Sequence, residues 1–293
     1  MLFKSNVLAL VGDKKNIRYP STKVIIWDDY TNSLALELSF KSPVLNVKLH
    51  KDIIVVATES NVFVYALNGY NLIDAITTYN NPLGTVAVSC CKDSKVLACP
   101  HIKEGHVRIQ HYGLCYSLSI DQKRTNIFKT NKRAIACMSL NYSGSLLAVA
   151  SIRGTKIKIF NTRTSEKLQE LRRGSKNAEI LCITFHRSSM FLACTSSKDA
   201  VHIFELYDSI KTINESEYKD YVKNTPPDEI GYKNNVIKLN PSVRNQSAKL
   251  AAVGGLLSNY FHSHWSFSRL KLNDAGKICG FADGNHFVGT LLS

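Results

Sequence analysis

The sequence predicts an all-β protein built as a β-propeller, and three observations support that prediction. A short pattern of β-branched and aromatic residues recurs five times, with starts separated by 38, 45, 50 and 44 positions, at residues 24–27, 62–65, 107–110, 157–160 and 201–204. Other short strand patterns surround each copy, and Gly, Asn, Ser and Asp residues separate them. Several short strands in a repeat of about 40–45 residues are typical of a propeller blade.

The blades follow one another in chain order. They are predicted at residues 1–42, 43–80, 81–130, 131–173 and from about 178, with a further fragment from about 275 to the end. Alternation and turn residues predict individual strands at residues 134–140, 146–151, 155–160, 168–172, 181–185, 191–195, 265–272 and 287–292. We therefore expect a single propeller domain over residues 1–293, with about five blades and part of another.

One segment, residues 207–262, departs from this rhythm, and loops of such length are usually functional or disordered. Its second half is apolar and follows several basic residues. Leu250, Val253, Leu257 and Phe261 would share one helical face, which suits insertion into a membrane interface. Paired glycines at 254–255 weaken a helix there, so an inserting loop fits equally well. An insertion whose apolar half covers a strand is the alternative.

Composition indicates a negatively charged partner. The chain has 37 Lys and Arg against 23 Asp and Glu, a net charge of +14, which favours nucleic acid or an anionic membrane. Its eight cysteines form no C-x-x-C pair, and we expect reduced core residues of a cytosolic or nuclear protein. The sequence has no signal-peptide pattern and no apolar run of about 18 residues, so any membrane association is expected to be peripheral.

The motif content argues against an enzyme. The nine histidines form no H-E-x-x-H pattern, and neither G-x-S-x-G nor a P-loop occurs. We expect no catalytic residue, no metal and no cofactor.

The sequence Leu171-Arg172-Arg173-Gly174 lies at the end of the fourth blade, after the strand pattern at residues 156–160 and before the next repeat. Successive side chains of an extended segment point to opposite sides, so the two arginines can serve two different pockets. Guanidinium groups are permanently charged and present a planar fork that fits phosphate oxygens. The alternative is a solvated surface pair or a structural ion pair.

These residues resemble the PROPPIN family, whose animal members are called WIPI proteins. The resemblance rests on Leu171-Arg172-Arg173-Gly174 and on five further stretches in the family's order, at residues 8–12, 19–29, 151–163, 196–204 and 260–267. It implies a WD40-type propeller of seven blades. The family's first blade and the last strands of its seventh would have no counterpart here.

The resemblance implies recognition of phosphatidylinositol 3-phosphate (PtdIns3P) and phosphatidylinositol 3,5-bisphosphate (PtdIns(3,5)P2) through two basic pockets. By position, the first pocket would comprise Ser151, Thr155, Lys158 and Arg172, and the second Arg173, Ser196 and His202. The segment 207–262 would insert into the membrane through Leu250, Val253, Leu256, Leu257 and Phe261.

Three departures from the family pattern affect these pockets. Asn131 replaces a usual His and Lys158 a usual Arg in the first pocket, while Ala200 replaces a Thr in the second. Asn cannot become cationic, Lys lacks the guanidinium fork, and Ala lacks a hydroxyl donor. We expect weaker binding in both pockets rather than its loss.

The resemblance also implies partners and a location. The chain would recruit lipid-transfer or conjugation-machinery proteins of autophagosome assembly, through a surface on residues 1–80. It would be cytoplasmic and peripheral on phagophore or autophagosomal, endosomal, or lysosomal or vacuolar membranes.

A protein-interaction scaffold with reduced or lost lipid binding is the second hypothesis, with a basic RNA-binding propeller as its variant. Aromatic residues are not interleaved with basic ones as a nucleic-acid stacking platform requires, so we do not expect nucleic acid.

Overall fold

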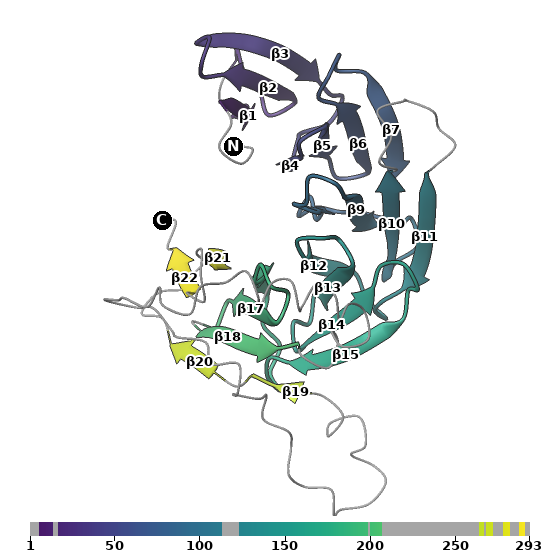
Figure 1. Cartoon of the computed structure of the whole chain (residues 1–293), viewed down its shortest axis with the longest axis vertical. Coiled ribbons are helices and arrows are strands. Elements are labelled where there is room, and N and C mark those ends of the chain that lie inside the picture. The colour runs from purple at the N-terminus through teal and green to yellow at the C-terminus, as the bar shows by residue number, and fades with distance from the viewer. Residues whose placement is uncertain are drawn as a thin grey trace, which may run out of the picture. The chain divides into compact units, whose positions relative to one another are not determined.

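The computed structural model describes residues 6–13, 17–112, 123–198 and 200–206, and short strand segments at 264–266, 268–271, 278–281 and 287–290. Every regular element in these ranges is a β-strand (Figure 1). None of the described ranges contains a helix that could cross a membrane. The chain divides into two compact units, Met1–Lys132 and Arg133–Ser293.

The first unit contains three antiparallel sheets. One has three strands, β1 (Val7–Val11), β2 (Lys23–Asp28) and β3 (Ser33–Ser39). The next has four, β4 (Asn46–Leu49), β5 (Ile53–Ala57), β6 (Asn61–Ala66) and β7 (Leu72–Thr77). The third also has four, β8 (Ala87–Val88), β9 (Lys95–Pro100), β10 (His106–Tyr112) and β11 (Arg124–Lys129).

The second unit begins with a five-stranded sheet and a four-stranded sheet. The first comprises β12 (Ile135–Leu140), β13 (Leu146–Ser151), β14 (Lys156–Asn161) and β15 (Lys167–Arg172), with β19 (His264–Trp265) added parallel to β15. The second comprises β16 (Ile180–Phe185), β17 (Phe191–Ser196), β18 (Ala200–Glu205) and β20 (Ser268–Lys271). The strands β21 (Ile278–Phe281) and β22 (Phe287–Thr290) pair with each other.

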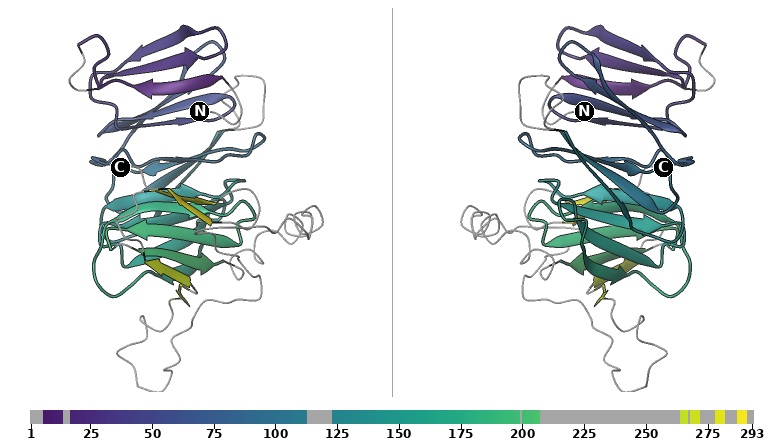
Figure 2. Two further views of the ribbon diagram at one scale, coloured as in Figure 1. Left: turned by 90° about the vertical axis from the view of Figure 1, so that its left-hand side faces the viewer. Right: turned by 90° about the vertical axis from the view of Figure 1, so that its right-hand side faces the viewer.

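The observed strands agree closely with the predicted ones. Within each unit the sheets follow one another in chain order as successive layers (Figure 2). The turn predicted at 141–144 is present, because the Gly144 amide donates to the Asn141 carbonyl at 3.1 Å. The single strand predicted at 265–272 is wrong. The structure divides it into β19, which pairs with β15, and β20, which pairs with β18.

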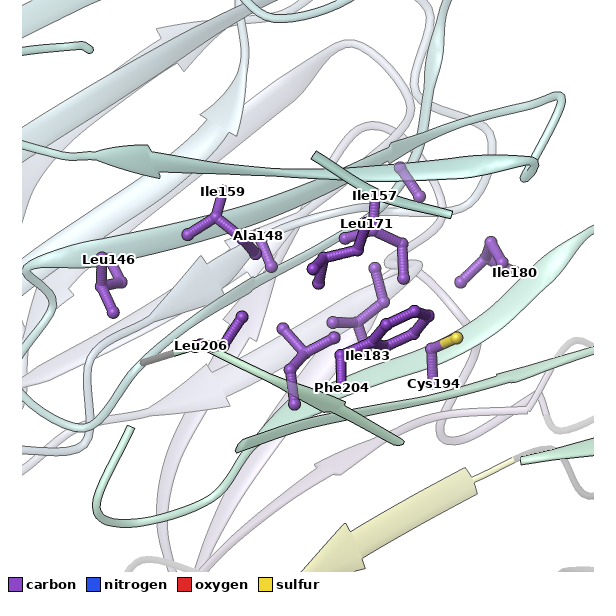
Figure 3. Close-up of a cluster of buried hydrophobic side chains, with 12 residues drawn as sticks. Leu146, Ala148, Ile157, Ile159, Leu171, Ile180, Ile183, Cys194, Phe204 and Leu206 are labelled. Atoms are coloured by element: carbon purple, nitrogen blue, oxygen red, sulfur yellow. The ribbon is translucent and has the colours of Figure 1, made fainter. Parts of the chain in front are cut away.

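Alternate residues on facing sheets form the cores. Between the sheet of β12–β15 and the sheet of β16–β18, side chains from both sides interdigitate (Figure 3). This core comprises Leu146, Ala148, Ala150, Ile157, Ile159, Leu171, Ile180, Ile183, Leu192, Cys194, Phe204 and Leu206. Burying a side chain such as Leu171 contributes about 1.5–3 kcal/mol, so the strand that carries the arginine pair is firmly held.

The first unit repeats this construction. The core between the sheets β4–β7 and β8–β11 comprises Ile53, Val55, Ala57, Val62, Val64, Ile76, Val86, Leu97 and Cys99. A further cluster, centred on Val24, Ile26, Val44, Ile54 and Val56, lies against the opposite side of β5. The structure gives free thiols at Cys90, Cys91, Cys99, Cys137, Cys182 and Cys194.

Candidate functional site

The two adjacent arginines lie on opposite sides of one strand end. Arg172 pairs with Lys156 across the β14–β15 ladder, and the Arg173 amide extends the ladder by donating to the Thr155 carbonyl at 3.0 Å. Leu171, on the Arg173 side, belongs to the core shared with β16–β18, so Arg172 points away from that core. Arg172 is 7% exposed and Arg173 is 6% exposed. A solvated surface pair is therefore excluded.

A glycine turn positions Arg173. Its Nε donates to the Gly154 carbonyl at 2.7 Å, and its Nη2 donates to the Lys176 carbonyl. Gly154 has a φ of +58°, and a Cβ at this position would lie 1.8 Å from the Ala178 carbonyl oxygen. Only glycine allows this approach, so the turn that holds the guanidinium depends on residue 154. Sequence reasoning missed this role because it depends on a contact with Ala178.

Three polar residues of the predicted second pocket, Arg173, Ser196 and His202, lie in the layer between the β12–β15 sheet and the β16–β18 sheet. We call these three residues the Arg173 group. Cys194 pairs with His202 across β17 and β18, and Cys194 belongs to the core beside Leu171. Side chains two positions apart on a strand share a face, which puts Ser196 on the Cys194 side. The structure thus brings these three residues into one layer.

Polar atoms in this layer are strongly desolvated. Ser196 is 1% exposed, and its Oγ has no hydrogen-bond partner among the described residues. The His202 Nδ1 lies 3.1 Å from the Ser266 Oγ, at hydrogen-bond distance. Burial raises the pKa of the Cys194 thiol to about 12, although the nearby Arg173 charge opposes that rise. A buried hydroxyl without a partner next to an arginine is a place where an anion can be accommodated.

The predicted first pocket lies on the face of the β12–β15 sheet that points away from β16–β18. We call Ser151, Lys158 and Arg172 the Arg172 group. Lys158 pairs with Glu170 and also with Val149, so β13, β14 and β15 all contribute to this face. Alternation from Val149 puts Ser151 on it as well. The structure gives Thr155 a different link, because its carbonyl accepts from the Arg173 and Gly174 amides.

A carboxylate that sequence reasoning missed partly neutralises this face. The Glu170 Oε1 lies 2.5 Å from the Lys156 Nζ, and its Oε2 lies 3.9 Å from the Lys167 Nζ. Glu170 lies directly opposite Lys158 across β14 and β15. The register of these two strands is the information that would have identified it. Ser266, also missed, is 64 positions from His202 and gave no signal in the sequence.

Two of the residues that depart from the family pattern, Asn131 and Ala200, lie in different units of the structure. Asn131 belongs to the first unit, and its buried Nδ2 has no hydrogen-bond partner among the described residues. Ala200 is buried at the start of β18, where it pairs with Ser196. The predicted membrane-inserting residues, Leu250, Val253, Leu256, Leu257 and Phe261, lie outside the described residues.

Comparison with known proteins decides the family, because residues 2–224 match PROPPIN. The chain is a PROPPIN. It is 37% identical over 224 residues to autophagy-related protein 18e of Arabidopsis thaliana, covering 76% of this chain. The PROPPIN described here spans only 58% of that relative's length.

Solved PROPPIN-like structures share the fold. Kluyveromyces lactis Hsv2 with its complete loop 6CD superposes with a TM-score of 0.64 at 20% identity, over 95% of this chain and 72% of that one. KlAtg21, solved in complex with the coiled coil of AgAtg16, gives a TM-score of 0.57 at 24% identity, over 70% of this chain and 65% of that one. The predicted all-β propeller fold is confirmed.

Proposed function

We propose that this PROPPIN is a non-catalytic phosphoinositide effector that binds PtdIns3P and PtdIns(3,5)P2 on membranes and recruits autophagy proteins. The observation that carries the proposal is the arginine pair, nearly buried on opposite sides of one strand end. Guanidinium groups held at a strand end can present charged hydrogen-bond donors to a phosphate bound there.

The Arg173 group offers complementary chemistry for one phosphate. The carbonyls of Gly154 and Lys176 orient the guanidinium in advance, which lowers the ordering cost of binding. The Ser196 hydroxyl can donate to a phosphate oxygen without breaking a hydrogen bond within the described structure. The His202 imidazole adds a third polar group.

The Arg172 group would be the weaker binder of the two. Lys158 supplies a point charge without a fork. Glu170, opposite Lys158, lowers the positive potential of the face while it pairs with Lys156. We assign the first headgroup to this pocket, with Ser151 and Thr155 as hydroxyl donors beside Lys158 and Arg172.

Stable attachment would combine several weak contacts. Two headgroup sites and an inserted segment, with Leu250, Val253, Leu256, Leu257 and Phe261 as its apolar residues, raise the effective concentration of each contact. We place the protein on phagophore or autophagosomal, endosomal, or lysosomal or vacuolar membranes as a peripheral cytoplasmic protein.

Recruitment of a partner would use the early blades. Residues 1–80 expose large apolar side chains, including Leu34 at 49% and Leu72 at 53%, which suit a protein interface. KlAtg21, which shares this fold, was solved with the coiled coil of AgAtg16. Lipid-transfer and conjugation-machinery proteins of autophagy are the partner classes we propose.

Co-sedimentation with vesicles tests the lipid function. One vesicle population carries PtdIns3P, another PtdIns(3,5)P2, and a third an equal charge of phosphatidylserine. We expect the wild-type chain to prefer the phosphoinositides, and Arg172→Thr with Arg173→Thr to lose at least about ten-fold in affinity, because charged hydrogen bonds are lost. The exposed Arg163→Thr is the matched control. Equal binding to all vesicles would show that the chain recognises only negative charge and not the phosphoinositide headgroup. Unchanged binding by the double variant would favour the scaffold function.

Ser196→Ala separates binding from stability. Because the Ser196 Oγ has no hydrogen-bond partner in the described structure, removing it should change the free energy of unfolding by less than about 1 kcal/mol. Affinity for PtdIns3P vesicles should fall by about three- to ten-fold, the value of one lost hydrogen bond. Thermal unfolding and vesicle binding are measured together, and unchanged affinity would remove Ser196 from the proposed pocket.

A further inference from the structure

The first unit contains a layer that corresponds, position by position, to the layer of the Arg173 group. Ala57 pairs with Val62 in one sheet as Ala150 pairs with Ile157 in the other. The outer strands then align, because Asn61 pairs with Thr77 as Lys156 pairs with Arg172. Thr78 therefore takes the place of Arg173.

The facing sheets correspond as well. Cys99 pairs with Arg108 across β9 and β10, as Cys194 pairs with His202 across β17 and β18. His101, two positions after Cys99, takes the place of Ser196. Thr78, His101 and Arg108 are called the Arg108 group. The layer of the first unit thus also contains an arginine, which comes from the other sheet.

Arg108 forms no ion pair with a carboxylate of the described residues. Among the described residues its buried Nε has no hydrogen-bond partner, and its Nη2 donates to the neutral Gln110 Oε1 at 3.3 Å. Asp74, the carboxylate of the layer, is occupied by Lys123 at 2.5 Å and by the Tyr112 hydroxyl at 3.2 Å. The half-buried Arg108 guanidinium therefore keeps a buried, unpaired Nε–H, and an anion is the partner that such a charged donor binds most strongly.

Thr78 supplies a second unpaired group in the same layer. Its amide donates to the Ser60 carbonyl at 2.9 Å and extends the ladder, so its side chain lies on the side of Ile76, which belongs to the core shared with Cys99. Thr78 is 5% exposed, and its Oγ1 has no partner among the described residues. The buried Thr130 and Thr162 are paired, to the Gly105 carbonyl at 3.1 Å and to the Gly144 carbonyl, whereas the buried Thr195 Oγ1 also has no partner among the described residues.

Histidines lie beside these groups at the end of the sheets. The Tyr79 amide donates to the His101 carbonyl at 3.1 Å, which joins the residue after Thr78 to His101. The rings of His101 and His106 lie 6.4 Å apart. Burial lowers the pKa of His101, and the charges of His106, Arg108 and Lys103 lower it further. Cationic side chains therefore lie around His101, with Glu104 in the same turn.

We propose that the Arg108 group binds one phosphate group, in a site separate from both proposed phosphoinositide pockets. The Arg108 guanidinium supplies charge-assisted donors, and the Thr78 hydroxyl donates a further hydrogen bond. One guanidinium and one hydroxyl match a single tetrahedral anion. The phosphate belongs either to a membrane headgroup or to a free inositol phosphate, which share this chemistry.

The test uses the full chain with Arg172→Thr and Arg173→Thr, so that the two proposed pockets cannot account for binding. Inorganic phosphate and inositol 1,3-bisphosphate are titrated at constant ionic strength while NMR follows the arginine Nε–H signals. Vesicles containing PtdIns3P form the lipid arm. Arg108→Gln and Thr78→Val are added in turn, and Arg18→Gln, an exposed arginine of the same unit, is the control.

We expect the Arg108 Nε–H signal to shift on addition of phosphate, and Arg108→Gln to weaken binding at least about ten-fold. Thr78→Val should weaken it by about three- to ten-fold with an unchanged thermal midpoint, because the Oγ1 loses no bond within the described residues. Arg108-dependent binding to vesicles identifies a headgroup, and binding only to the soluble compounds identifies a free phosphate. An unshifted Arg108 signal, or equal binding by Arg108→Gln, overturns the proposal. Because the background lacks both pocket arginines, that failure leaves the phosphoinositide function unaffected.

Discussion

Two layers of this PROPPIN share a scaffold and differ in the residues at its edge. Between β4–β7 and β8–β11, and between β12–β15 and β16–β18, aliphatic side chains fill the centre, and a buried cysteine occupies the same place, Cys99 or Cys194. At the edge, the arginine comes from β10 in the first layer and from the residue after β15 in the second. The apolar positions determine the blade, while the positions at its end can vary without disturbing the core.

Thiol reactivity gives the largest expected effect and tests whether the two cores are equally closed. Burial raises the pKa of both Cys99 and Cys194 from 9.0 to about 12, so the thiolate fraction at pH 8 falls about a thousand-fold. We expect iodoacetamide to label the exposed Cys90 in the folded protein and both buried thiols only after unfolding. Mass spectrometry identifies the labelled sites.

These raised pKa values also have a consequence for stability. Their contribution to stability is complete below the unfolded-state pKa near 9 and is lost as the pH rises through the folded-state pKa near 12. Selective labelling of Cys194 in the folded protein would show that the second layer opens more readily. The two cores would then not be equally protected from solvent.

Gly154→Ala should destabilise the second unit strongly, whereas the corresponding turn of the first unit needs no glycine. A left-handed backbone costs a non-glycine residue about 1–3 kcal/mol, and the clash with the Ala178 carbonyl adds to this cost. Glu59→Ala, at the corresponding position of the β5–β6 turn, is the matched control and should change the free energy of unfolding by less than about 0.5 kcal/mol. Chemical denaturation measures both variants. Similar losses in the two variants would contradict the glycine requirement.

Glu170→Gln should separate charge from stability on the Arg172 face. The carboxylate holds Lys156 at 2.5 Å on a partly exposed surface, so its loss should cost less than about 1 kcal/mol. The more positive face should bind anionic vesicles about two- to five-fold more tightly at low salt, and this gain should disappear at high salt. The exposed Glu166→Gln serves as the control. A salt-independent gain would indicate a structural change instead.

Gly174→Ala should have the smallest effect on stability, in contrast to Gly154→Ala. No atom lies within 4 Å of a Cβ at position 174, and the residue has no left-handed φ. Thermal unfolding should therefore change by less than about 1 kcal/mol. If vesicle affinity falls while stability is retained, the open space beside Gly174 serves the ligand. A large loss of stability would show that the glycine serves the fold.

The sequence was sufficient for the blades because their signal is local. Alternating apolar residues and turn residues predicted strands such as Leu146–Ser151 within one or two positions. The arginine pair was also visible, since alternation follows from the extended backbone alone. The same reasoning predicted one strand at residues 265–272, which is wrong. The strand breaks near Ser266 because its two parts pair with different sheets.

What could not be predicted depends on contacts between distant residues. The need for glycine at 154 comes from the carbonyl of Ala178. Arg108 was part of a recognised strand pattern, yet its correspondence to His202 requires the registers of four strand pairs. The unpaired state of Thr78 and Ser196 is a property of packing, which no local pattern of residue types specifies.

The contact between His202 and Ser266 joins two distant positions of the chain, and the entropy of joining them depends on the number of residues in between. Its ends are 64 positions apart in the chain yet meet at 3.1 Å, next to the strand that carries the arginines. The entropic cost of bringing two chain positions together grows only with the logarithm of the number of residues between them, so doubling that number would add about 0.6 kcal/mol. The segment between β18 and β19 can therefore gain or lose many residues during evolution at little cost to the blades it joins.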